Sequence, residues 1–222
     1  MKQPIQRIIE NTLLRSLGHW TNQKRQDRAV KKRQARELVE WERNGKPVPP
    51  PHLVKQRTLK SYSEKYGLKT LVETGTFYGE MVEAMKSDFD RIYSIELSSD
   101  LFEKAKDRFK RSAHIEIFHG DSGIELERIT KKLDEPALFW LDGHYSGGET
   151  AKGEESTPIY KELSHILGSP ESGHVIVIDD ARLFGSDHDY PSIRELTDYV
   201  NRKRADLEVE VQDDSIRITP KR

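Results

Sequence analysis

The chain has no cysteine among its 222 residues. This absence excludes disulfides, thiolate nucleophiles and zinc sites built on cysteine. The sequence also lacks any run that approaches the roughly 18 apolar residues needed to span a bilayer. Its first residues lack the continuous apolar core of a secretory signal. We therefore expect a cytoplasmic protein without disulfides.

The net charge is only −1, but the charged residues are distributed unevenly along the chain. Residues 1–60 carry 15 Lys/Arg and 5 Asp/Glu, whereas residues 61–222 carry 22 and 33. The segment KPVPPP, residues 46–51, stops any helix and forms a stiff spacer. We predict a basic helical extension with a proline-rich linker over residues 1–50 and a second domain over residues 51–222. Opposite charge indicates that the two parts have different roles.

Beyond the linker, short apolar segments alternate with helical ones, beginning with TLVETG at residues 70–75. Such alternation predicts an α/β fold, in which helices cover both faces of a mostly parallel sheet. Seven strands are expected in a Rossmann-like, doubly wound arrangement. The last two, LEVEVQ and SIRIT, are joined by a tight turn at Asp213-Asp214. They predict an antiparallel C-terminal hairpin at the edge of the sheet.

The carboxyl ends of the first five predicted strands are acidic. The residues there are Glu73, Glu96, Asp121, Asp142 and the pair Asp179-Asp180. Ligands of open α/β sheets bind beyond these strand ends. Carboxylates that converge on one edge repel one another. We therefore expect a bound ligand or cation to offset the repulsion.

The first strand-to-helix turn, ETGTFYGE at residues 73–80, contains Gly75 and Gly79. Glycines allow the backbone to approach a ligand closely. The turn lacks the dinucleotide fingerprint GxGxxG, because Phe77 stands where its second glycine would be. This departure argues against NAD.

Two further strand ends carry residues suited to a nucleoside. Glu96 follows Gly79 by 17 residues, and a carboxylate there can accept both ribose hydroxyls. The segment GDSG, residues 120–123, ends the third strand. Structural alternatives exist for both: Glu96 could cap a helix together with Ser98 and Ser99, and Asp121 could cap the helix that follows it.

The Glu-x-Gly-x-x-x-Gly turn, Glu96 and GDSG together resemble the class I S-adenosylmethionine-dependent methyltransferases, over residues 69–123. The resemblance implies an S-adenosylmethionine site in which the turn faces the amino-acid end of the cofactor. It places the adenine near Asp121. The cofactor-binding residues that it implies are Glu73, Gly75, Thr76, Phe77, Gly79, Glu96, Leu97, Asp121, Ser122 and Asp142.

The segment FWLDGHYSGGE, residues 139–149, and the pair Asp179-Asp180 resemble the metal-dependent enzymes of the macrocin O-methyltransferase-like and catechol O-methyltransferase-like groups. The resemblance implies that Asp142, Asp179 and Asp180 hold Mg²⁺, which prefers oxygen ligands. Such a cation lowers the pKa of an acceptor hydroxyl and orients it. The position of the general base is occupied by His144, whose imidazole suits proton removal near neutral pH. Asp142 would share in catalysis.

The predicted function is methyl transfer from S-adenosylmethionine to a hydroxyl of a small molecule or sugar, with Mg²⁺. Two alternatives stay open. One is a metal-free methyltransferase that acts on another acceptor. The other is a non-catalytic module that binds the cofactor and docks a partner through the basic extension.

Two loops are candidate lids or recognition loops. Residues 146–158 are glycine-rich and include Lys152, and residues 181–191 include His188 and Tyr190.

The basic extension allows three interpretations. It can pack on its own domain or self-associate through residues 1–45, or lie on an anionic membrane surface as a peripheral helix. It can also bind nucleic acid through residues 24–36. The last is disfavoured, because that run lacks aromatic residues for base stacking.

Overall fold

The computed structural model describes residues 29–30, 32–143, 158–186 and 190–221. The chain divides into two compact units, Met1–Pro47 and Val48–Arg222. In the first unit, residues 32–43 are helical, and the indole nitrogen of Trp41 donates to the carbonyl of Pro47 at 2.7 Å. The basic segment before residue 29 lies outside the described residues. In the part of the chain that is described, no helix is both long and apolar enough to cross a membrane.

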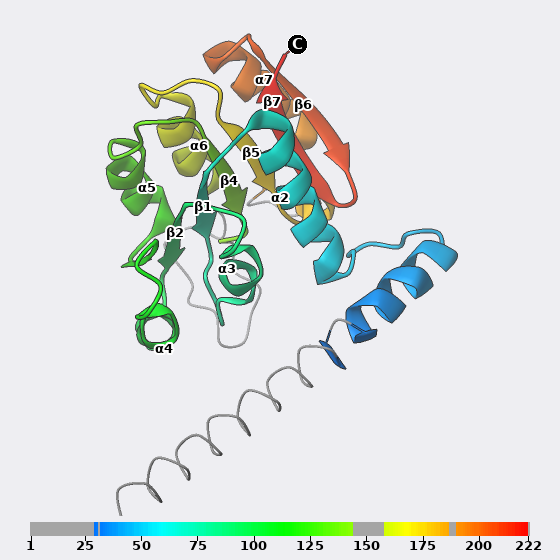
Figure 1. The fold of residues 1–222 in the computed structure, drawn as a ribbon. Coiled ribbons are helices and arrows are strands. Elements are labelled where there is room, and N and C mark those ends of the chain that lie inside the picture. The colour runs from blue at the N-terminus through cyan, green and yellow to red at the C-terminus, as the bar shows by residue number, and fades with distance from the viewer. Residues whose placement is uncertain (1–28, 31, 144–157, 187–189, 222) are drawn as a thin grey trace, which may run out of the picture. The chain divides into compact units, whose positions relative to one another are not determined.

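The second unit is built on one seven-stranded sheet with the order β3-β2-β1-β4-β5-β7-β6 (Figure 1). Neighbouring strands are parallel except in the pairs β5–β7 and β6–β7, which are antiparallel. The predicted Rossmann-like sheet with a C-terminal hairpin is therefore confirmed. The strands are β1 (Thr70–Thr74), β2 (Arg91–Glu96), β3 (Ile115–His119), β4 (Ala137–Leu141), β5 (Val175–Ile178), β6 (Leu207–Gln212) and β7 (Ser215–Pro220).

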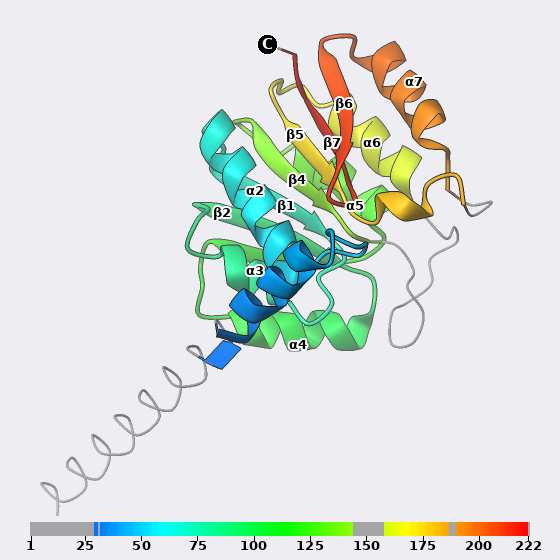
Figure 2. The ribbon, with the colours of Figure 1, turned by 90° about the vertical axis from the view of Figure 1, so that its right-hand side faces the viewer.

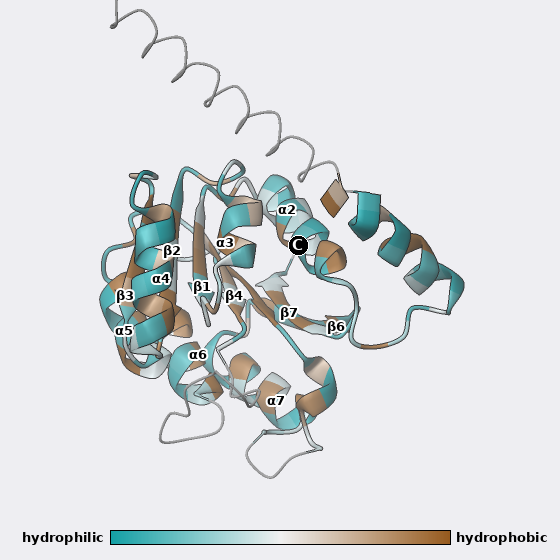
Figure 3. Cartoon of the chain, turned by 90° about the horizontal axis from the view of Figure 1, so that it is seen from below, coloured by the Kyte–Doolittle hydropathy of each residue, from teal (hydrophilic) through white to brown (hydrophobic). Residues whose placement is uncertain are grey.

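Helices cover both faces of this sheet, with α2 and α3 on one face and α6 and α7 on the other (Figure 2 and Figure 3). Successive side chains of β4 point to opposite faces. Leu138 and Trp140 pack with residues of α2 and α3, whereas Phe139 and Leu141 pack with residues of α5, α6 and α7. The helices are α2 (His52–Tyr66), α3 (Glu80–Met85), α4 (Ser99–Phe109), α5 (Ser122–Thr130), α6 (Ile159–Leu167) and α7 (Ile193–Lys203).

The hairpin does not simply extend the edge of the sheet. The last strand, β7, inserts between β5 and β6, so that β6 becomes the edge. Ile216 and Ile218 of β7 are fully buried, whereas most of β6 is exposed. Asp213 and Asp214 both have positive φ, 49° and 60°, which a tight two-residue hairpin turn requires.

The parallel strands end at one edge of the sheet, where β1 lies between β2 and β4. The chain runs from β1 outward to β2 and β3, and then returns to the other side with β4 and β5. Such a reversal of strand order opens a crevice at the carboxyl ends of the strands, which is the usual ligand site of open α/β sheets.

Candidate active site

The turn between β1 and α3 lies directly against the end of β4. Gly75 has φ +83°, and a Cβ atom there would lie 2.5 Å from the carbonyl oxygen of Asp142. Gly79 has φ +72°, and a Cβ atom there would lie 2.6 Å from the ring of Phe109. Both glycines are therefore required by conformation and by space. Gly79, in the left-handed conformation, directly precedes α3, which begins at Glu80.

Glu96, at the end of β2, holds this turn in place. Its carboxylate accepts from the backbone N–H of Phe77 at 2.7 Å and from that of Ser98 at 2.9 Å. Phe77 has a positive φ of 50°, which this hydrogen bond helps to stabilise. Ser98 itself caps α4. Each carboxylate oxygen has a second lone pair, so both oxygens can still accept from a ligand.

Glu73 lies behind the turn and is only 1% exposed. The hydroxyl of Ser94 donates to its carboxylate, and Thr76 and Ser94 are joined by a hydrogen bond of 2.6 Å. Burial raises the pKa of Glu73 to about 8; the Ser94 hydrogen bond opposes the rise, and the charges of Asp142 and Glu96 add to it. At neutral pH the Glu73 side chain is thus mostly protonated.

Glu73→Gln is expected to become increasingly favourable for stability as the pH rises. The unfolded carboxyl releases its proton near pH 4.5 and the folded one near pH 8, so ionisation destabilises the native state progressively across that window. Each unit of pKa difference corresponds to about 1.4 kcal/mol. Denaturant unfolding at about pH 5 and about pH 9 should show the variant gaining several kcal/mol on the wild type. The exposed control Glu103→Gln should gain nothing, and an equal difference at both pH values would refute the burial argument for Glu73.

Asp121 caps the helix that follows it, which is the structural alternative named above. Its side chain accepts from the backbone N–H of Gly123 at 2.7 Å and caps α5. Ser122, the first residue of α5, is buried. Asp121 remains half-buried at the end of β3, where its second oxygen can serve a ligand.

Asp142, Asp179 and Asp180 come together at the ends of β4 and β5. Each offers a carboxylate oxygen, and these three oxygens lie within 4.8 Å of one another. We call them the acidic cluster. The backbone N–H of Asp142 donates to the carbonyl of Thr74, and that of Asp179 donates to the carbonyl of Leu141, so the sheet itself fixes two members. Asp179 is 1% exposed, and its Oδ1 has no hydrogen-bond partner among the described residues.

Lys55 of α2 contacts this cluster, which the sequence analysis did not anticipate. Its ammonium forms an ion pair with Asp179 Oδ2 and lies 3.9 Å from Asp180 Oδ1. Burial opposes the charged form of Lys55, but the carboxylates outweigh it and the pKa of Lys55 is raised. Burial raises the pKa of Asp179, Lys55 opposes that rise, and Asp180 adds to it. The helical spacing of α2 carries a signal for this contact. Leu59 and Tyr62 follow Lys55 by four and seven residues and are buried, so Lys55 lies on the face of α2 that packs on the sheet.

A second basic residue, Arg182, also contacts the cluster. Arg182 donates to Asp180 Oδ1 at 2.7 Å and also pairs with the carboxylate of Asp214. Asp214 is buried in the turn before β7 and accepts from the backbone N–H of Arg182 at 2.9 Å. The inserted hairpin therefore orients Asp180, which has a left-handed φ of 54°.

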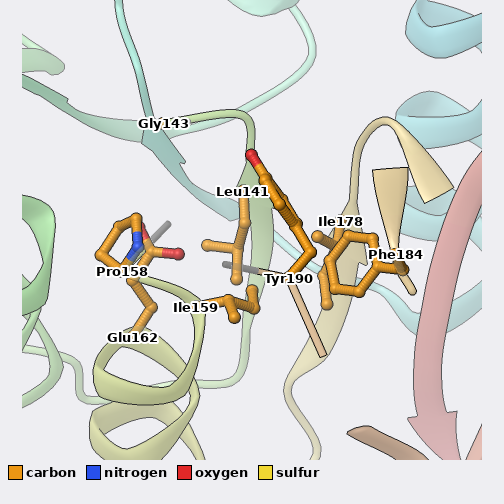
Figure 4. A pocket seen from close by; sticks show the side chains of 8 residues that line it. All are labelled: Leu141, Gly143, Pro158, Ile159, Glu162, Ile178, Phe184 and Tyr190. Carbon is orange, nitrogen blue, oxygen red and sulfur yellow. The ribbon is translucent and has the colours of Figure 1, made fainter. Parts of the chain in front are cut away.

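A small pocket opens beside the ends of β4 and β5. Figure 4 shows Tyr190 and Phe184 on one side of it and Pro158 with Glu162 on the other. The two rings make an edge-to-face contact, with centroids 5.3 Å apart. Most of the remaining wall is aliphatic. The lining residues are Leu141, Gly143, Pro158, Ile159, Glu162, Ile178, Phe184 and Tyr190.

Some predicted site residues cannot be placed. His144, Lys152 and His188 lie outside the described residues, as does the loop 146–158 up to residue 157. Of the second candidate lid, residues 181–191, the described part contributes Phe184 and Tyr190 to the pocket. Thr76 is buried in the β1–α3 turn, and Leu97 is half-buried just after β2.

No protein-family model matches the sequence, and no curated protein matches it significantly. Solved structures do match. The O-methyltransferase TomG from Streptomyces achromogenes, in complex with S-adenosylmethionine, has a TM-score of 0.56 at 16% identity, over 84% of this chain and 88% of that one. An O-methyltransferase from Bacillus cereus, in complex with S-adenosylhomocysteine, has a TM-score of 0.57 at 15% identity, over 85% and 90%.

The methyltransferase PaMTH1 of Podospora anserina, also bound to S-adenosylhomocysteine, matches at a TM-score of 0.52 and 18% identity, over 84% of this chain and 88% of that one. The fold is that of the class I S-adenosylmethionine-dependent methyltransferases. At identities of 15–18%, the structural likeness shows the fold alone.

Proposed function

We propose that the chain is a methyltransferase that moves a methyl group from S-adenosylmethionine to a hydroxyl of a small molecule or sugar. The observation that carries the proposal is the direct contact between the β1–α3 turn and the residue that begins the acidic cluster. Gly75 packs against the backbone of Asp142. A donor bound on the turn and an acceptor bound at the cluster would therefore be neighbours, as in-line methyl transfer requires.

The cofactor would lie across the carboxyl ends of β1, β2 and β3. The turn from Gly75 to Gly79 would receive the amino-acid end of the cofactor. Glu96, already positioned by two backbone N–H groups, would accept from the ribose hydroxyls. Asp121 and Ser122 would lie at the adenine.

The acidic cluster fits a hard divalent cation. Its members supply carboxylate oxygens, the ligands that Mg²⁺ prefers, and Asp179 Oδ1 is buried without a partner among the described residues. We infer that Asp142, Asp179 and Asp180 hold Mg²⁺. Bound there, the cation would lower the pKa of the acceptor hydroxyl and orient it.

The acceptor would enter beside the cluster. Leu141 and Gly143, the two chain neighbours of Asp142, both line the pocket. The aromatic and aliphatic wall would bury the apolar part of an acceptor and exclude water from the reacting atoms. His144, two residues beyond Asp142, is our candidate for the base that removes the hydroxyl proton.

A metal-free methyltransferase is the second candidate. The observation that favours it is Lys55, because its ammonium already supplies a positive charge to Asp179 and Asp180. Dependence of turnover on a divalent ion separates the two candidates.

Calorimetry with S-adenosylhomocysteine tests the proposed function. We expect one-to-one binding, which Glu96→Ala weakens by about 1.5–3 kcal/mol, the range for losing hydrogen bonds to a charged acceptor. Glu103→Ala, on the exposed side of α4, is the matched control and should bind like the wild type. Absence of binding by the folded wild type, or tighter binding of NAD, would refute the cofactor assignment.

A further inference from the structure

We propose that Lys55 is a built-in cation of the acidic cluster, which a divalent ion must displace before it can bind. The inference rests on the metal site of the proposed function. It assigns two roles to Lys55, which is not one of the carboxylates. Lys55 sets how tightly the cluster binds a metal, and its ammonium balances part of the negative charge of the cluster when no metal is bound.

The contacts place the Lys55 ammonium among the metal-binding oxygens. It pairs with Asp179 Oδ2 and lies 3.9 Å from Asp180 Oδ1. Its side chain is only 18% exposed, and Nζ lies 5.9 Å from the centre of the Trp140 ring. This is a lysine held in a partly dry site, in contrast to the usual surface lysine whose ion pairs are screened by water.

The helix that carries Lys55 is itself fixed. One turn further along α2, Leu59 is fully buried in the core. A further turn on, the hydroxyl of Tyr62 donates to Glu210 of β6 at 2.8 Å. The backbone of Lys55 therefore stays in place, and only its flexible four-carbon stem can carry the ammonium away from the cluster.

The carboxylates of the cluster attract a divalent ion, whereas the Lys55 ammonium repels it. Three carboxyl side chains meet one lysine, and Arg182 is shared between Asp180 and Asp214. Negative charge remains in excess. An ion that binds Asp179 would nevertheless meet an ammonium at contact distance, and like charges so close repel strongly in a partly buried site. Displacement of the ammonium removes this repulsion and costs the Lys55–Asp179 pair.

The matched variants lie on the same helix. Lys55→Met keeps the length and packing of the stem and removes the charge, whereas Lys55→Arg keeps a charge. Lys60→Met is the control, because Lys60 pairs with Asp88 at 2.9 Å and is half exposed. The probe is Mn²⁺, titrated into each protein in the absence of cofactor and acceptor. Binding is measured by calorimetry and by the rise in melting temperature.

We expect Lys55→Met to bind Mn²⁺ at least about tenfold more tightly than the wild type, as removal of a competing cation at contact distance requires. Lys60→Met should match the wild type, and Lys55→Arg should bind no more tightly than it. In chelator, Lys55→Met should melt below the wild type, because the buried carboxylate of Asp179 has lost its counterion. Mn²⁺ should then raise its melting temperature more than that of the wild type.

Two outcomes contradict the inference in distinguishable ways. If Lys55→Met binds Mn²⁺ as weakly as the wild type, or more weakly, Lys55 does not compete with the metal, although the metal site stands. If neither protein binds Mn²⁺, the metal assignment and the displacement both fail, whereas binding of S-adenosylhomocysteine still decides the cofactor assignment.

Discussion

Asp179→Asn is expected to lower turnover by roughly 10²-fold or more, because it would remove a charged ligand from the cation that we propose to activate the acceptor. The proposed cation would act on the acceptor oxygen and not on the sulfonium, so affinity for S-adenosylhomocysteine should change by less than about twofold. Turnover is measured as formation of S-adenosylhomocysteine with the hydroxyl acceptor that supports the highest rate. A metal chelator should abolish wild-type turnover, and added Mg²⁺ should restore it.

Asp88→Asn is the matched control, because Asp88 pairs with Lys60 away from the acidic cluster. It should keep full turnover. Full wild-type turnover in chelator would contradict the metal assignment and favour the metal-free alternative. Near-normal turnover of a folded Asp179→Asn enzyme would show that catalysis does not need the charge of Asp179.

His144→Ala is expected to lower turnover by about 10²–10⁴-fold, the usual range for loss of a general base. Its affinity for S-adenosylhomocysteine should stay close to that of the wild type, because the proposed base would act on the acceptor proton. Added imidazole should restore part of the lost turnover to the variant, since a small free base can occupy the space that the side chain leaves.

His114→Ala serves as the control for replacing a histidine, because His114 is exposed and its imidazole hydrogen-bonds to the backbone carbonyl of Lys86. It should behave like the wild type with or without imidazole. If His144→Ala turns over almost normally, His144 is not the base, whether or not the metal assignment holds.

The sequence predicts the sheet and its acidic edge well, because both follow from local patterns. Buried parallel strands are short apolar runs, and acids at their ends must meet at one edge of the sheet. Asp142 and Asp179 come together for this reason, as the pattern indicated. Gly75 could likewise be placed in a tight turn from its spacing to Gly79.

The rest depends on packing between segments that are distant along the chain. Lys55 reaches Asp179 across 124 residues, and only the position of α2 on the sheet decides this contact. Arg182 and Asp214 meet because β7 inserts beside β5, whereas the hairpin pattern alone indicated an added edge. The dual role of Glu96, which fixes the turn and faces the edge, also follows from the tertiary structure.

In the proposed site, a cofactor on the β1–α3 turn and a divalent ion on the acidic cluster lie side by side. The most direct measurement is an anomalous density map from crystals grown with S-adenosylhomocysteine and Mn²⁺. We expect the cofactor ribose at Glu96 and a manganese peak bound by Asp142, Asp179 and Asp180, with the Lys55 ammonium moved away. Cofactor density elsewhere, or an ordered Lys55 ammonium among the carboxylates with no manganese peak, would contradict it.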